Sequence, residues 1–213
     1  MKISVIMASY LSEYAGSASF RGYKFERAVN SFLNQTHKDK ELIIIADGCE
    51  KTEKIVSEKF IRQYPEIKCK KILKQPGVWS GNVRNEGLKI ATGDIICYLD
   101  TDDSFAPNHL KDIDKQFAKP GTSRKYYDWV YFDDVYSSAN EQNKKHTVSL
   151  QFQSAGTSTI AHLNKLEGIS WEGCDGDGHD WKFIQKLMSL YPNHTKIKGT
   201  GYLIHHLRNQ FDF

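Results

Sequence analysis

Strand-like and helix-like segments alternate through the first hundred residues, and this order constrains the fold more than any other feature of the chain. Short runs rich in β-branched residues predict buried strands, whereas apolar residues at a three-to-four spacing predict amphipathic helices. The expected strands are 3–8, 41–46, 69–73 and 94–99, and the helices between them are 25–33, 52–64 and 80–91. Because parallel strands need a crossover connection, usually a helix, this order favours an α/β fold with a mostly parallel sheet.

The second half of the chain is less regular. Its patterns predict helices at 109–117 and 180–190 and strands at 129–133, 148–152 and 202–205. No internal repeat, low-complexity tract or Pro/Gly/Ser linker divides the chain. We therefore expect a single domain over residues 1–213.

The composition narrows the classes of function. Hydrophobic residues make up 39% of the 213 residues, which is enough for a globular core. The net charge of +3 is too small to indicate a nucleic-acid partner by itself. The apolar runs are far shorter than the roughly 18 residues that a membrane span needs, and no signal-peptide pattern is present. Four widely separated cysteines without a C-x-x-C pair argue against a zinc site or a disulfide framework, so we expect a cytoplasmic protein.

The most informative local feature is the acidic run Asp100-Thr101-Asp102-Asp103, which ends a hydrophobic strand. In open α/β sheets, ligands bind beyond the carboxyl ends of the strands. Carboxylates crowded there repel one another unless a cation lies between them. Their oxygen atoms suit Mg²⁺ or Mn²⁺ held together with a substrate diphosphate. The alternative is an exposed acidic turn that caps the next helix.

The segment 92–103 closely resembles the A-x-G-[DE]-x-I-x-[FY]-L-D-x-D-D motif of family 2 glycosyltransferases, which are inverting, nucleotide-sugar-dependent enzymes with the GT-A fold. Other segments resemble further motifs of this family in the same order: 4–10, 27–36, 41–48 and 81–88. The resemblance covers residues 3–103 well and the remainder more loosely. It implies a Rossmann-like sheet flanked by helices, a nucleotide-sugar-binding half at 1–103 and an irregular acceptor-binding half at 104–213.

Residue by residue, the resemblance assigns the donor site. Ser9 and Tyr10 would meet the nucleobase, and Asp47 would accept a hydrogen bond from a base N–H. Arg84 would present its planar cation to the base edge or the diphosphate, and Asp100 would lie near the ribose and the metal. The alternatives are an ordinary turn aspartate for Asp47 and a surface arginine for Arg84.

The same resemblance assigns a Mn²⁺ or Mg²⁺ ion to the acidic run. Asp102 would be its principal ligand, and Asp103 is a further candidate because the family varies in which carboxylate binds. The segment 202–206 resembles a Y-R-x-H strand of the family. There His205, with His206 as its alternative, would complete the metal shell or touch the diphosphate, or would be a structural histidine.

Inverting transfer also needs a general base for the attacking hydroxyl. The family supplies it from a Glu-Asp pair at the start of a helix, and the segment 178–184 resembles that region with His179 in place of the glutamate. Asp180 is therefore the expected base, and Trp181 is expected to form a platform under the acceptor. Alternatively, Asp180 is a helix N-cap and Trp181 belongs to the core.

These assignments predict a metal-assisted inverting glycosyltransferase that moves a sugar from a nucleotide-diphosphate donor, expected to be a UDP-sugar, to a glycan or other hydroxyl acceptor. The alternative is a non-catalytic module that binds a sugar nucleotide or a glycan on the same fold. It is supported by Ala46, which replaces the first acid of the family's D-D-G motif, and by His179. A nucleotidyltransferase would carry a Gly-rich, basic phosphate loop near its N-terminus, and the segment 9–12 is not one.

Overall fold

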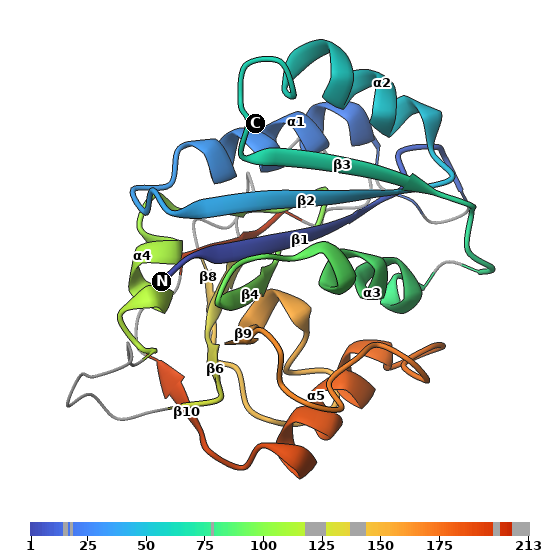
Figure 1. Cartoon of the computed structure of the whole chain (residues 1–213). Helices are drawn as coiled ribbons and strands as arrows, with labels where there is room; N and C mark the ends of the chain where they lie inside the picture. The colour runs from blue at the N-terminus through green and yellow to red at the C-terminus, as the bar shows by residue number, and fades with distance from the viewer. Residues whose placement is uncertain are drawn as a thin grey trace.

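A computed structural model describes residues 1–14, 17, 19–77, 79–117, 127–136, 144–197 and 201–205. These residues form a central sheet of seven strands and a second sheet of four (Figure 1). The central sheet has the order β10-β6-β9-β4-β1-β2-β3, with β1 (Ile3–Ser9), β2 (Lys40–Asp47), β3 (Ile67–Ile72), β4 (Ile95–Tyr98), β6 (Trp129–Phe132), β9 (Ile160–Leu163) and β10 (His194–Ile197). The second sheet has the order β5-β11-β7-β8, with β5 (Ser104–Phe105), β7 (Asp134–Tyr136), β8 (Lys144–His146) and β11 (Tyr202–Ile204). The expected α/β class with a mostly parallel sheet is confirmed.

The first half of the chain builds the parallel part of the central sheet. β1 pairs in parallel with both β2 and β4, and β2 pairs in parallel with β3. Ser9, at the end of β1, lies opposite Ala46, which precedes Asp47 at the end of β2. Since β4 runs in the same direction, the acidic run that follows it begins at the same edge of the sheet. The carboxyl ends of three strands therefore meet where the sequence predicted a ligand site.

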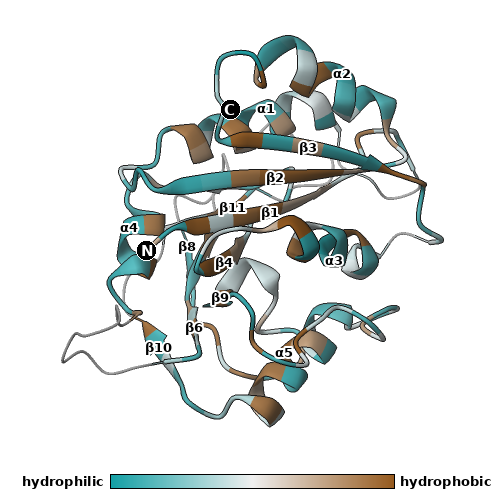
Figure 2. Cartoon of the chain, viewed as in Figure 1, coloured by the Kyte–Doolittle hydropathy of each residue, from teal (hydrophilic) through white to brown (hydrophobic). Residues whose placement is uncertain are grey.

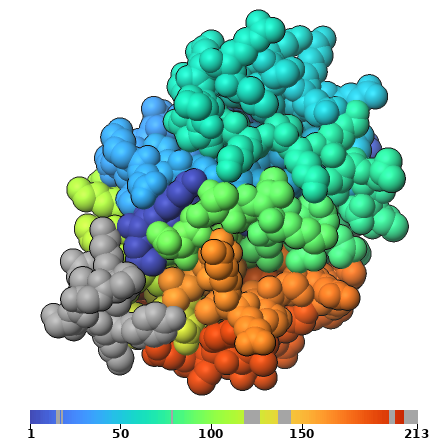
Figure 3. All heavy atoms as spheres, in the orientation of Figure 1, coloured from blue at the N-terminus to red at the C-terminus, as the bar shows by residue number. Residues whose placement is uncertain are grey.

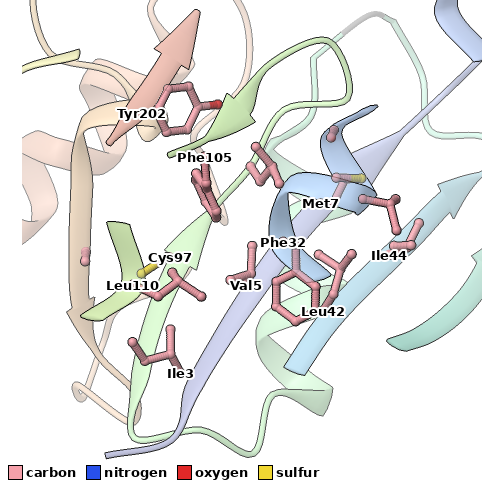
Figure 4. Packing of buried hydrophobic residues seen from close by; sticks show 14 of the residues in the cluster. Ile3, Val5, Met7, Phe32, Leu42, Ile44, Cys97, Phe105, Leu110 and Tyr202 are labelled. Carbon is pink, nitrogen blue, oxygen red and sulfur yellow. The ribbon is translucent and has the colours of Figure 1, made fainter. Parts of the chain in front are cut away.

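The helices are α1 (Arg21–Leu33), α2 (Glu50–Lys59), α3 (Gly81–Ile90), α4 (His109–Asp114) and α5 (His179–Leu190). They cover both faces of the sheet, because successive side chains of a strand point to opposite faces. Ile3 and Val5 of β1 pack in one apolar cluster with Phe32 of α1 (Figure 4). Ile6 of the same strand packs in another cluster with Phe183 of α5. β2 is hydrophobic along its middle, while much of α2 is hydrophilic on its outer side (Figure 2). None of the helices described is both long and apolar enough to span a membrane.

The predicted helices of the first half are confirmed with shifted ends. α1 begins at Arg21 rather than at residue 25, because the guanidinium of Arg21 donates to the carbonyl oxygen of Tyr10 and fixes a first turn that carries no apolar signal. α2 ends at Lys59 rather than at 64, and the chain continues in turns up to residue 63. In the second half, α4 ends at Asp114 rather than at 117.

The prediction of a strand at 148–152 is wrong, because this segment forms bends and a turn in which Gln153 has a φ of 64°. Its apolar character comes from burial of Val148 in the cluster that contains Phe183. The strand that the sequence did not reveal is β9, which runs antiparallel to both β4 and β6 and joins the two halves of the chain in one sheet. β10, parallel to β6 at the sheet edge, was also not predicted.

Candidate active site

A cleft of about 750 Å³ opens at the carboxyl ends of β1, β2 and β4. The structure brings together in its lining the predicted site residues Ser9, Tyr10, Asp47, Arg84, Asp100, Asp102 and Asp180. These residues are far apart in the sequence and come from both halves of the chain. In Figure 3, the green atoms, which include α3, lie between the blue-to-cyan start of the chain and the orange second half. The residue that joins the two halves inside the cleft is on this helix.

Arg84 of α3 links acidic residues of both halves. Its Nη2 donates to Asp100 Oδ1 at 2.9 Å, and its Nη1 donates to Asp180 Oδ1 at 2.9 Å. The same Nη1 lies 3.3 Å from His179 Nε2, which in turn lies 3.0 Å from Asp180 Oδ1. The guanidinium carbon lies 5.0 Å above the ring of Trp171. Only 5% of this side chain is exposed, so Arg84 is not a surface arginine.

A glycine allows the second half to reach Arg84. Gly81 begins α3, and a Cβ atom there would lie 2.6 Å from the carbonyl oxygen of Cys174. Because no larger residue fits, the segment 171–174 packs directly against the start of the helix. The ring of Trp171 stacks on Phe183 of α5 with centroids 4.0 Å apart and donates through Nε1 to the hydroxyl oxygen of Tyr98 at 3.3 Å. Trp171 is therefore a fixed support beneath the guanidinium.

The charges of this cluster shift its pKa values. Burial alone would raise the pKa of Asp180, but Arg84 and the hydrogen bond from His179 outweigh it and hold the pKa well below its usual value. The pKa of Asp100 is raised, first by burial and then by the charges of Asp180 and Asp102, against the effect of Arg84. Burial would lower the pKa of Arg84, but the two carboxylates raise it, so Arg84 stays charged.

The other end of the cleft is formed by β1, β2 and the turn after β3. Both carboxylate oxygens of Asp47 are bonded: Oδ2 accepts from Lys74 Nζ at 2.7 Å, and Oδ1 accepts from the backbone N–H of Gln75 at 2.6 Å. Lys74 Nζ also lies 4.9 Å above the ring of Tyr10. Ser9 lines the cleft but is buried, and its hydroxyl bonds that of Thr52 of α2 at 2.8 Å. Lys74 was not predicted, since nothing distinguishes it in the sequence from neighbouring lysines.

Only part of the acidic run lines the cleft. Asp100 and Asp102 line the cleft, whereas Asp103 is buried and does not. Asp103 Oδ2 accepts from the hydroxyl of Tyr202 at 3.0 Å, and Oδ1 accepts from the backbone N–H of His205 at 2.9 Å. The ring of His205 bonds the Ser104 hydroxyl at 2.7 Å. Burial, followed by the charges of Asp102 and Asp100, raises the pKa of Asp103.

Two carboxylates therefore remain for a divalent cation. Within the described part of the chain, no three His, Cys, Asp or Glu side chains are grouped so that they alone would hold a metal ion. Mg²⁺ is commonly held by only one or two carboxylates together with substrate phosphates. Burial, and then the charges of Asp180 and Asp102, raise the pKa of Asp100, and a bound cation would favour its carboxylate form. Asp100 and Asp102 fit a metal that is completed by its substrate. The alternative histidine ligand, His206, lies outside the described residues.

A second cavity of about 310 Å³ lies beyond the start of α5. Trp79, His179 and Asp180 line both this cavity and the cleft, so the two spaces share a wall. Trp181 lines the second cavity and is half-buried, packed against the apolar cluster that contains Phe183. The ring of Trp79 lies 5.3 Å from that of His179. Trp79 was not predicted as a site residue, and in the sequence only its position just before the helix that carries Arg84 distinguishes it.

The start of α5 determines where Asp180 lies. Gly178 is the N-cap with a φ of +70°, and a Cβ atom there would lie 2.7 Å from Phe152, so a glycine is required. Asp180 is in the first turn of the helix rather than at the N-cap position. The positive end of the helix dipole favours its carboxylate form. The other oxygen of Asp180, Oδ2, lies 3.3 Å from the hydroxyl of Thr157.

Comparison with known proteins identifies the family. The model of "Glycosyl transferase family 2" matches residues 21–164, which is most of the chain. The match runs from α1 to β9 and begins after β1. The chain belongs to glycosyl transferase family 2. The family predicted from the motifs is therefore confirmed.

Several curated glycosyltransferases are similar to the chain. The chain is 38% identical over 117 residues to an uncharacterized glycosyltransferase of Nostoc sp., covering 55% of this chain and 33% of that protein. It is 32% identical over 114 residues to the poly(ribitol-phosphate) beta-N-acetylglucosaminyltransferase TarP of Staphylococcus aureus, covering 53% of this chain and 32% of that protein. The chain thus spans about a third of the length of these relatives.

Solved structures confirm the GT-A fold. TarS of S. aureus, residues 1–349 in complex with UDP, superposes with a TM-score of 0.72 at 18% identity, over 97% of this chain and 61% of that one. The mannosyltransferase PcManGT of Pyrobaculum calidifontis, in complex with GDP-Man and Mn²⁺, superposes with a TM-score of 0.65 at 15% identity, over 95% of this chain and 56% of that one. At these identities the likeness concerns the fold alone.

Proposed function

We propose that this chain transfers a sugar, with inversion, from a UDP-sugar to an acceptor hydroxyl, and that residues 1–213 act as one catalytic domain. The observation that carries the proposal is the cluster at Arg84, in which a buried guanidinium holds carboxylates of both halves at the border between two cavities. This is the arrangement expected where a donor in the cleft meets an acceptor in the second cavity. Glycosyl transfer is also the activity after which these curated relatives are named.

The donor would bind with its nucleobase between Tyr10 and Asp47 and with its diphosphate toward Arg84. Asp47 is already held in place by Lys74 and Gln75, so little ordering is needed when a base N–H approaches it. A TarS complex with UDP-GlcNAc, from a protein of the same fold, favours uridine as the base. The planar fork of Arg84 suits phosphate oxygens as well as carboxylates.

Asp102, assisted by Asp100, would hold a Mn²⁺ or Mg²⁺ ion. The ion, when bound, would neutralise charge on the departing diphosphate. Asp103 and His205 would not contact the ion. Asp103 would instead hold the acidic run against β11, by accepting from the Tyr202 hydroxyl and from the backbone N–H of His205. This assigns to Asp103 and His205 a positioning role in place of the direct metal contact that the motifs predicted.

Asp180 would be the general base. Its carboxylate would take the proton of the acceptor hydroxyl as the hydroxyl oxygen bonds the anomeric carbon and the bond to the diphosphate oxygen breaks on the opposite face. General-base catalysis of this kind contributes roughly 10²–10⁴-fold. In the absence of donor, Arg84 makes Asp180 a weak base. A diphosphate that drew the guanidinium toward itself would raise the pKa of Asp180 and prepare it for proton transfer.

A non-catalytic, sugar-nucleotide-binding role is the second candidate. It is favoured by Ala46 and by the low pKa of Asp180, whose carboxylate is bonded by Arg84 and His179. Both candidates bind a donor, but only the enzyme breaks the bond between the sugar and the diphosphate.

The test measures donor binding by thermal shift, with and without Mn²⁺, and slow release of UDP from UDP-sugars. We expect Asp102→Ala to abolish Mn²⁺-dependent stabilisation by the donor, and Asp180→Asn to keep the stabilisation while reducing UDP release at least 100-fold. Asp112→Asn, which changes an exposed carboxylate of α4, is the matched control. Donor stabilisation without any UDP release would establish the binding module instead.

A further inference from the structure

The second cavity carries an aspartate–histidine pair that the mechanism above does not use. Asp134 of β7 and His146 of β8 line it, and His146 Nδ1 lies 2.8 Å from Asp134 Oδ1. Asp134 is 2% exposed, whereas the side chain of His146 is 29% exposed. The buried carboxylate therefore holds one nitrogen of the ring. The other nitrogen, Nε2, has no hydrogen-bond partner among the residues that the structure describes and remains for a ligand.

Aromatic side chains form much of the remaining lining. Trp79, Tyr136, Phe152 and Trp181 all line the cavity, and the first three are large apolar side chains that are 37–49% exposed. Exposed aromatic rings grouped in one cavity suit a ligand with apolar faces. A sugar ring has such faces, formed by its C–H groups, and hydroxyl groups at its rim.

The charges of the lining argue against an anionic ligand. Asp177 and Asp180 are carboxylates in this lining, and none of the residues described there is a lysine or an arginine. A phosphate or carboxylate group would meet repulsion from these carboxylates. A hydroxyl group can donate to or accept from the imidazole and fits either of its protonation states.

We propose that the second cavity binds a terminal, uncharged sugar ring of the acceptor, stacked on its aromatic side chains and recognised by a hydroxyl hydrogen-bonded to His146 Nε2. The inference rests on the proposed function, because it makes this cavity the acceptor site. The proposed acceptor also differs in charge from the one in the name of TarP, poly(ribitol-phosphate), which is a polyanion.

The experiment uses saturation-transfer NMR on the whole chain with UDP present. The probes are the methyl β-glycosides of glucose, galactose and N-acetylglucosamine, with ribitol 5-phosphate as the anionic comparison. We expect at least one methyl glycoside to bind and ribitol 5-phosphate not to bind at pH 7.5. Binding of ribitol 5-phosphate alone, or of none of the probes, would overturn the proposal.

Two substitutions test the role of His146. In His146→Asn the amide nitrogen replaces Nδ1 and keeps the bond to Asp134, but nothing replaces Nε2. We expect the dissociation constant of the bound glycoside to rise roughly five- to tenfold. In His146→Gln the amide reaches the position of Nε2 and should restore part of this loss. Lys144→Gln, an exposed residue of the same strand, is the control. Equal affinities in the wild type and His146→Asn, or an equal loss in the control, would refute the assignment.

A separate measurement distinguishes this proposal from the proposed function. Stabilisation of the wild type by UDP-sugar and Mn²⁺ reports on the cleft alone. If the donor stabilises the protein and no glycoside binds, only the acceptor assignment fails. If the donor has no effect, the proposed function fails, and with it the inference that depends on it.

Discussion

Replacing Arg84 with methionine tests whether this side chain joins the two halves of the chain. The substitution keeps an unbranched chain of similar length and removes the charge. Losing one partner of a fully buried ion pair costs about 3–5 kcal/mol. The side chains of Asp100 and Asp180 are 40% and 29% exposed, so water compensates them in part, and we expect a loss of about 2–3 kcal/mol in the free energy of unfolding. For a chain of this length, that lowers Tm by about 5–10 °C.

The assay is thermal and urea unfolding of Arg84→Met, Asp180→Asn and the double variant, followed by circular dichroism. Because Arg84 and Asp180 are in contact, their effects should not add, and the coupling energy should be about 1–2 kcal/mol. Arg62→Met, which changes an exposed arginine in the turn after α2, should alter stability by no more than about 0.5 kcal/mol.

Additive effects, within about 0.3–0.5 kcal/mol, would show that the two side chains do not interact in solution. An Arg84→Met variant as stable as the Arg62→Met control would refute the reasoning more completely. It would mean that the buried guanidinium and its two carboxylates contribute nothing net to the joining of the two halves.

Three further predictions concern other residues. Glu41 is 2% exposed, and although burial raises its pKa, hydrogen bonds from Lys68, Ser4 and Thr92 lower it to about 2. The lowered pKa of Glu41 contributes about 3 kcal/mol to the free energy of unfolding, which is present above pH 4.5 and lost as the pH falls through about 2. Glu41→Gln should therefore flatten this part of the pH–stability curve. Gly178→Ala should cost about 1–3 kcal/mol in urea unfolding, because φ is +70° and Phe152 blocks the added methyl group; an unchanged midpoint would contradict this. Lys74→Met should raise the KM for the donor about tenfold with little change in kcat, since Lys74 holds Asp47 in the cleft; steady-state kinetics that show a change in kcat alone would contradict it.

The first half of the fold was predictable because its strands are continuous apolar runs and its helices have a regular apolar spacing. β2 is buried at every position, as expected for a strand between two parallel neighbours. The second half was harder, because its strands are two to four residues long and depend on their neighbours. β9 has only four residues, Ile160–Leu163, and is specified by pairing with β4 and β6 rather than by its own pattern.

The site was predictable to the extent that motif residues end strands or begin helices. Seven of the predicted residues line the cleft: five lie at or just after the ends of parallel strands, and Arg84 and Asp180 lie near the starts of helices. The sequence did not predict that Asp103 turns away from the cleft, since this depends on the hydroxyl of Tyr202, 99 residues later. The pair Asp134 and His146 had no signal either, because it arises from pairing of two short strands.

The antiparallel strand β9 has a consequence for any shortened form of this protein. β4 is hydrogen-bonded on one side to β1 and on the other only to β9, among the strands described. A fragment that ended before residue 160 would leave the backbone amides and carbonyls of Ile95–Cys97 unpaired along an apolar, fully buried strand. Because such an open edge recruits other chains, we expect the first half of the chain, produced on its own, to self-associate.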